Sequence, residues 1–152
     1  MEKIKNIIQS SIDVKTKILN DEKLLQTVND CVKEIVKAFE KGKKVLFCGN
    51  GGSASDAQHL AAEFSGRFYT DRDALPAEAL HCNTSYLTAV ANDYSYDVIY
   101  SRLLKGIGNS GDILVGLSTS GNSKNIVNAF EMAREKGMFT IAFTGSTGGK
   151  LK

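Results

Sequence analysis

A histidine and a glutamate four residues apart are the side chains in this sequence best suited to chemistry. His59 and Glu63 lie in a stretch that predicts a helix over about 53–65, and a spacing of four places both on one helix face. The apolar positions of that helix lie on another face, so the pair points largely away from its own sheet. Such a pair suits zinc, or supplies a general base near a bound sugar. The plain alternative is a solvated polar pair, and two ligands alone cannot complete a metal site.

Two polar loops are built for an anion. The sequence GNGGS at 49–53 and the sequence STSGNS at 118–123 each follow an apolar run and precede a predicted helix. Glycines let the backbone approach a ligand closely, and a helix N-terminus presents free N–H groups. Hydroxyl groups add donors for phosphate oxygens. Gly, Asn and Ser are also ordinary turn and cap residues, but two such loops in equivalent places favour an anionic ligand.

Nucleotide binding is disfavoured. Gly49, Gly51 and Ala54 match the spacing G-x-G-x-x-A. The dinucleotide fingerprint also needs an acidic residue after the second strand, where the sequence reads LHCN at 80–83. The phosphate-loop ending Gly-Lys-Ser/Thr is absent from both loops.

Asn92 and Asp93 are interpreted as turn residues, which matter for function only if they face the same cleft. His81 is interpreted as a histidine at a strand end with local hydrogen bonds.

The elements around these residues predict an α/β fold. Residues 1–41 show helical apolar spacing and predict a helical pair, with Asp21 as an N-cap and Gly42 as a stop. That apolar face needs either the sheet or another subunit to cover it. Apolar runs then alternate with helical stretches, which predicts a parallel sheet buried on both faces. The expected strands are 44–48, 77–82, 112–117 and 139–143, and the expected helices are 53–65, 85–91, 94–105 and 124–136.

Composition narrows the class further. The 152 residues suit one domain, 1–152, with the helical pair at 1–41 and the sheet core at 42–152. A net charge of +2 with scattered lysines argues against nucleic acid, and no apolar run is long enough to span a membrane. Three cysteines without metal spacing predict reduced thiols and a cytoplasmic protein. The fourth strand is followed by no covering helix, so we expect a further C-terminal strand and helix to be missing.

The sequence closely resembles the phosphoheptose isomerase (sedoheptulose 7-phosphate isomerase) family of SIS-domain proteins. The matching stretches are CGNGGSASDAQHLAAEFSGRF, AVANDYSYDVIYSR, GDILVGLSTSGNSKNIVNAFEMAREKGM and FTGSTGGKL. The resemblance implies a flavodoxin-like doubly wound parallel sheet and a homotetramer with active sites at subunit contacts. It also implies conversion of sedoheptulose 7-phosphate to D-glycero-D-manno-heptose 7-phosphate, an early step towards ADP-heptose and lipopolysaccharide core or surface polysaccharide.

The same resemblance assigns roles to individual residues. Glu63 would be the base that moves a proton between C1 and C2 through an enediol, and His59 and Glu63 would bind zinc. The substrate-binding residues would be Asn50, Gly51, Gly52, Ser53, Glu63, Asn92, Asp93, Ser118, Thr119, Ser120 and Ser123.

One departure from the family pattern and two alternative functions remain. The family carries a glutamine and a histidine on a C-terminal helix that complete the zinc site, and this sequence has no counterpart. We therefore expect weak zinc binding and little activity from residues 1–152 alone. A non-catalytic SIS-domain tetramer that binds the bacterial replication initiator is the alternative function, and Glu63 favours the enzyme. A sugar-phosphate-sensing regulatory domain ranks last, since no DNA-binding segment is present.

Overall fold

The computed structural model describes residues 1–152, which form two compact units, Met1–Val36 and Lys37–Lys152. The first unit contains helix α1 (Glu2–Leu19) and most of helix α2 (Glu22–Glu40). This confirms the predicted helical pair. Asp21 caps α2 as expected, because its carboxylate accepts a hydrogen bond from the Leu24 backbone N–H at 2.9 Å.

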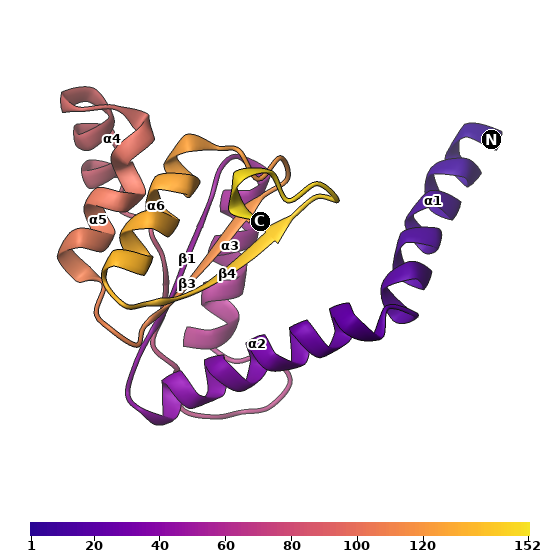
Figure 1. Cartoon of the computed structure of the whole chain (residues 1–152), viewed down its shortest axis with the longest axis horizontal. Coiled ribbons are helices and arrows are strands. Elements are labelled where there is room, and N and C mark those ends of the chain that lie inside the picture. Colours follow the sequence, from indigo (N-terminus) through magenta and orange to yellow (C-terminus); the bar gives the residue numbers. More distant parts are fainter. The chain divides into compact units, whose positions relative to one another are not determined.

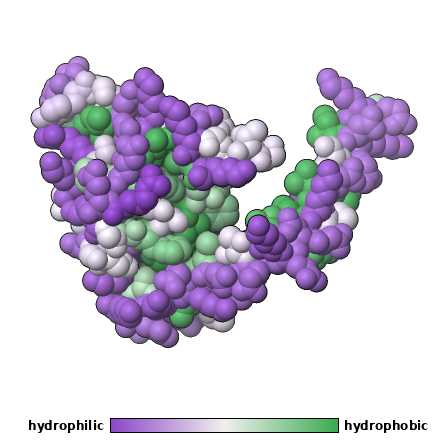
Figure 2. Space-filling view, viewed as in Figure 1, coloured by the Kyte–Doolittle hydropathy of each residue, from purple (hydrophilic) through white to green (hydrophobic).

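The helical pair carries an uncovered apolar stripe. No side chain of α1 is buried, and α2 buries only Ala38. The exposed stripe repeats at helical spacing and includes Ile4, Ile8, Ile12, Val28, Val32 and Val36. Figure 2 shows part of this apolar surface along α1. Neither helix therefore gains the burial that its apolar stripe allows.

The second unit is an α/β sheet with helices on both faces (Figure 1). Four parallel strands run in the order β2-β1-β3-β4, which confirms the predicted fold class. The strands are β1 (Val45–Gly49), β2 (Ala77–Ala79), β3 (Ile113–Ser118) and β4 (Phe139–Thr144). The helices are α3 (Gly52–Ser65), α4 (Thr84–Asp93), α5 (Ile99–Ile107) and α6 (Lys124–Glu135), with 3₁₀ turns η1 (Tyr96–Val98) and η2 (Gly149–Leu151).

Alternate strand residues face different helices. Leu46 and Cys48 of β1 belong to the main buried cluster, together with residues of α5 and α6. Phe47, between them, packs instead against Phe64 of α3, with ring centroids 6.0 Å apart. This period of two sets α3 on one face of the sheet and α5 with α6 on the other.

The prediction that all strands are buried on both faces is wrong for β4. All five residues of β1 are buried, but in β4 only Ile141 is. Phe139 and Phe143 are 42% and 57% exposed. The reason is position, because β4 is an edge strand that pairs only with β3.

Two further expectations are corrected around α4. Strand β2 is three residues long instead of six, and His81 and Cys82 lie in a turn. Asn92 and Asp93 were predicted to follow a short helix, but they form its last turn. The helix begins at Thr84 because Asn83 caps it, accepting a hydrogen bond from the Tyr86 N–H at 3.0 Å, and it ends where the Tyr94 N–H donates to the Val90 carbonyl oxygen.

Candidate functional site

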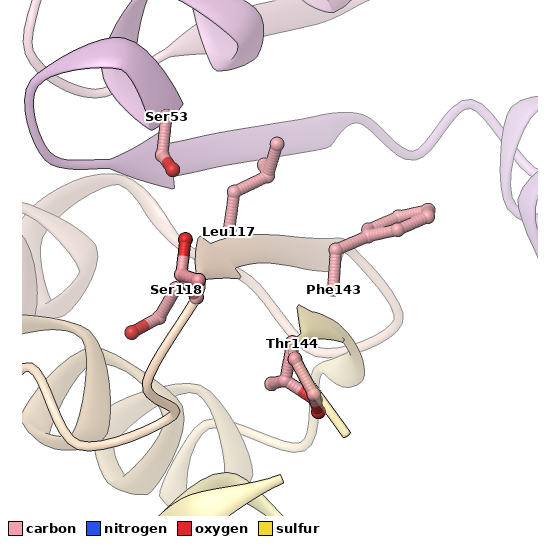
Figure 3. Close-up of a pocket in the computed structure, with 7 residues that line it drawn as sticks. Ser53, Leu117, Ser118, Phe143 and Thr144 are labelled. Atoms are coloured by element: carbon pink, nitrogen blue, oxygen red, sulfur yellow. The ribbon is translucent and has the colours of Figure 1, made fainter. Parts of the chain in front are cut away.

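A cleft of about 260 Å³ opens at the carboxyl ends of β1, β3 and β4. This is the edge where ligands bind in open α/β sheets. Its lining residues are Ser53, Leu117, Ser118, Thr119, Phe143, Thr144 and Gly145. Figure 3 shows the Ser53 hydroxyl pointing from the start of α3 toward the end of β3. The structure thus brings Ser53, Ser118 and Thr119, three of the predicted substrate-binding residues, to one cleft.

The first loop turns tightly into α3. Gly49 is required here, because a Cβ atom at this position would clash with the Ser53 carbonyl group. Gly51 precedes the helix, and the Ser53 N–H donates to the Asn50 carbonyl oxygen at 3.0 Å. The N-terminus of α3, with its positive dipole end, therefore lies at the cleft beside Ser53.

The hydroxyl groups of the second loop have two roles: some line the cleft, and others form hydrogen bonds within the loop. Ser118 and Thr119 line the cleft. Ser123 meets the buried Ser118, with the two hydroxyl oxygens 3.2 Å apart. Ser120 accepts a hydrogen bond from the Asn122 N–H at 3.1 Å, which shapes the loop from within. Ser120 and Ser123 thus hold the loop instead of lining the cleft.

A third loop, after β4, was missed. Thr144 and Gly145 line the cleft, and the Gly145 N–H donates to the Thr119 carbonyl oxygen at 2.9 Å. Further along, the Lys150 N–H donates to the Gly121 carbonyl oxygen at 2.9 Å. Its polar residues directly follow a predicted strand, as in the other two loops, but no helix was predicted after it, so only half of the signal was present.

His59 and Glu63 lie as a pair, but away from the cleft. The His59 Nε2 and Glu63 Oε1 atoms are 3.1 Å apart, and the side chains are 75% and 31% exposed. Neither lines the cleft. Ten residues of helix separate Glu63 from Ser53, about 15 Å along the axis. The exposure of His59 confirms that it points away from the sheet.

The His59–Glu63 pair supplies two ligands, fewer than a zinc site needs. Structural zinc sites use four protein ligands and catalytic ones three. No group of three or more His, Cys, Asp or Glu side chains in the chain could hold a metal. The residues present therefore do not form a zinc site by themselves.

The backbone that carries Glu63 is held by an arginine. Arg72 donates from Nη2 to the Glu63 carbonyl oxygen and from Nη1 to that of Phe64, both at 2.9 Å. A guanidinium group suits these otherwise free carbonyls at a helix C-terminus. Arg72 was not found from the sequence, because nothing in its spacing marks it as a cap for a helix that ends seven residues earlier.

Asn50, Asn92 and Asp93 also lie outside the cleft lining, as do Gly51 and Gly52. Asn92 donates to the Asp93 carboxylate at 3.0 Å, and both are exposed at the end of α4. The Asn50 side chain is hydrogen-bonded to Asn125 and Tyr96. Elsewhere, His81 has a buried Nδ1 atom without a partner, and burial lowers the pKa of its imidazole.

The groups beneath the first loop are neutral. Burial raises the pKa of Tyr100, whose hydroxyl donates to the Gly49 carbonyl oxygen at 2.5 Å. Burial also raises the pKa of the Cys48 thiol. Both groups stay protonated near neutral pH. Neither of these two groups therefore places a negative charge beneath the first loop.

Comparisons with known proteins agree with this geometry. The SIS domain family matches residues 9–145. A phosphoheptose isomerase from Aneurinibacillus thermoaerophilus is 51% identical over 148 residues, 97% of this chain and 75% of the relative. One from Clostridium acetobutylicum is 52% identical over 145 residues, 95% of this chain and 74% of the relative.

Solved structures show the same likeness. The phosphoheptose isomerase from Neisseria gonorrhoeae superimposes with a TM-score of 0.91 at 40% identity, over 99% of this chain and 77% of that one. The phosphoheptose isomerase from Francisella tularensis superimposes with a TM-score of 0.92 at 38% identity, over 97% of this chain and 76% of that one. Since these relatives are named isomerases, the replication-initiator-binding alternative is not favoured. The chain belongs to the phosphoheptose isomerase family of SIS-domain proteins.

Proposed function

We propose that this protein is an aldose–ketose isomerase that converts sedoheptulose 7-phosphate to D-glycero-D-manno-heptose 7-phosphate. The observation that carries the proposal is the cleft at the strand ends, where hydroxyl-bearing loops meet the N-terminus of α3. That edge suits the phosphate of a sugar phosphate. The similarity to named phosphoheptose isomerases supports the identity of the sugar.

The reaction needs one base and no redox cofactor. In the ketose the carbonyl group is at C2. A base removes a proton from C1 while the C2 oxygen gains a proton, which gives the enediol. The proton then returns at C2 while the C1 oxygen loses its proton, so the carbonyl group is now at C1. We assign the base to Glu63, which is partly buried at the last turn of α3 and whose backbone is fixed by Arg72. Because Glu63 does not line the cleft of its own chain, this assignment depends on an active site at a subunit contact.

The loops hold the two ends of the substrate in this proposal. Ser53, Ser118 and Thr119 hold the phosphate from the cleft lining. Ser120 and Ser123 support that site by shaping the second loop. Gly51 and Gly52 contribute backbone N–H groups, and Asn92 and Asp93 line the sugar.

Zinc binding is a separate part of the proposal. His59 and Glu63 supply two ligands, so the others must come from outside residues 1–152, from a further segment or another subunit. A bound divalent ion would stabilise negative charge that develops on the substrate oxygens. Metal analysis of the purified protein, with His59→Ala as the comparison, tests this part.

We also propose a homotetramer with active sites at subunit contacts. The exposed apolar stripe of α1 and α2 supports an assembly, because such a stripe on a single chain marks an interaction surface. The exposed His59 supports a site finished by another segment or subunit. Light scattering of the purified protein distinguishes a tetramer from a dimer or monomer.

We place the reaction in the cytoplasm, early in the supply of ADP-heptose for lipopolysaccharide core or surface polysaccharide. The three cysteines Cys31, Cys48 and Cys82 are all free, which suits a reducing compartment. No helix of the structure is both long and apolar enough to cross a membrane.

Turnover measured by NMR tests the proposed function. We expect the full-length protein to convert sedoheptulose 7-phosphate to the 7-phosphorylated aldoheptose, and residues 1–152 alone to show little activity. Sedoheptulose without its phosphate should react at least about a hundredfold more slowly, because binding energy from the phosphate positions the reacting carbons. Equal turnover of the two sugars, or none of the phosphorylated one, would contradict the proposal.

A further inference from the structure

A buried carboxamide lies between the two loops that follow β1 and β3. Asn125, in the first turn of α6, is 3% exposed. Only two other polar or charged residues, Asp112 and Ser118, are buried to this degree. A buried amide is costly unless its donors and acceptor find partners, so its partners indicate its purpose.

Asn125 forms a reciprocal pair with Asn50, 75 residues earlier. Asn125 Nδ2 donates to Asn50 Oδ1 at 2.8 Å, and Asn50 Nδ2 donates to Asn125 Oδ1 at 2.9 Å. The Tyr96 hydroxyl donates to the same Asn50 oxygen at 3.1 Å. Both lone pairs of the Asn50 carbonyl are therefore used within the protein.

These three side chains join three separate segments. Asn50 belongs to the first loop, Asn125 follows the second loop, and Tyr96 begins η1 just after the end of α4. The first loop is also held from below, where Tyr100 donates to the Gly49 carbonyl oxygen. Side chains from η1 and α6 thus hold the Asn50 side chain, and one from α5 holds the Gly49 backbone.

We propose that Asn125 is a positioning residue for substrate binding. It holds Asn50, and thereby sets the first loop against the second so that Ser53 and Ser118 face one anion. The inference rests on the proposed function of those loops. It also limits how Asn50 can bind substrate. The side-chain oxygen of Asn50 already accepts hydrogen bonds from Asn125 and Tyr96, so one amide hydrogen and the backbone of Asn50 remain for the substrate.

An isosteric variant separates positioning from simple space filling. Asn125→Asp keeps the size but removes the donor that Asn50 Oδ1 needs, and Asn125→Ala removes the pair entirely. The matched control is Asn128→Asp, because Asn128 lies on the same helix and bonds only to the Asp97 carbonyl oxygen. That hydrogen bond goes to η1 and not to either loop.

The measurement is the dissociation constant for sedoheptulose 7-phosphate by calorimetry, with KM and kcat in parallel. We expect both Asn125 variants to raise Kd and KM about tenfold while kcat per folded molecule changes less than about threefold. Asn128→Asp should shift Kd by less than about twofold. Wild-type Kd in a folded Asn125 variant overturns the proposal, as does a loss of kcat and melting temperature with Kd unchanged.

A double-mutant cycle checks that the two asparagines act together. Asn50→Ala and Asn125→Ala combined should weaken binding no more than about twofold beyond the stronger single change, because either one breaks the shared pair. Multiplicative effects overturn the proposal. If the Asn125 variants do not fold, Tyr96→Phe decides alone: we expect about a threefold rise in Kd, and no rise overturns the inference.

The calorimetry also distinguishes this inference from the proposed function. A wild-type protein that binds the sugar phosphate but does not isomerise it contradicts the enzyme assignment and leaves the Asn125 comparison intact. A wild-type protein with no measurable affinity overturns both, since the loops would then not hold this phosphate.

Discussion

Individual hydroxyl groups in the cleft have unequal roles. Ser118 is 5% exposed, lines the cleft and lies 3.2 Å from the Ser123 hydroxyl. Ser120 is exposed and accepts a bond from Asn122. One serine of this loop therefore faces a ligand directly, while the others set the shape of the loop.

Replacing Ser118 with alanine should weaken binding of the substrate phosphate. We expect KM to rise about tenfold with kcat nearly unchanged, the effect of losing one hydrogen bond to a charged group. Steady-state kinetics measures both constants. Ser110→Ala, in the turn before β3, is the control and should change neither constant; an unchanged KM for Ser118→Ala would exclude a direct phosphate contact.

Elements hold the loops through close backbone contacts. Gly121, in the second loop, has a φ of 65°, and the segment after β4 packs directly on it. A Cβ atom at Gly121 would clash with the Gly148 carbonyl group. The second loop is thus supported from outside by a segment that follows the last strand.

Gly121→Ala should displace the second loop. Backbone strain at a positive φ costs about 1–3 kcal/mol, and the clash adds to it. We expect a lower melting temperature in calorimetry together with a raised KM. Gly106→Ala, in α5 with open space around its Cβ position, should stabilise by about 0.5–1 kcal/mol. Equal effects of the two changes would contradict this view of the loop.

The elements were largely predictable and their connections were not. Apolar runs between glycine-rich loops marked β1 and β3, because strands buried on both faces leave that pattern. The exposed face of β4 depended on its edge position, which a local pattern does not contain. Asn125 was also out of reach, since an asparagine in a helix normally faces water and only the folded chain brings it to Asn50.

In the α/β unit, the candidate site lies at the carboxyl ends of the strands, and a partly buried ion pair lies at their amino ends. At the amino ends of the strands, buried Asp112 accepts hydrogen bonds from Lys44 Nζ at 2.6 Å, from the Lys44 N–H at 3.1 Å and from the Asn109 N–H at 2.9 Å. Burial raises the pKa of Asp112, but the Lys44 and Asn109 bonds outweigh it and lower the pKa overall.

Asp112→Asn should lower the free energy of unfolding by about 3 kcal/mol at pH 7, because the Lys44 ammonium loses its partner. A lowered folded-state pKa stabilises the protein above the unfolded value, near 3.9, and that contribution is lost as the pH falls through the folded value. The difference from wild type should therefore shrink below about pH 4. Urea unfolding across pH measures it, and Glu135→Gln should show less than about 0.5 kcal/mol at any pH.

The central claim is that Glu63 moves the proton in a sugar-phosphate isomerase. The most direct measurement is the turnover of sedoheptulose 7-phosphate by wild type and by Glu63→Gln, with substrate affinity measured in the same samples and Glu131→Gln as the control. We expect Glu63→Gln to lose at least about a hundredfold in kcat while it still binds the sugar phosphate. Turnover by Glu63→Gln at the wild-type rate would contradict the account.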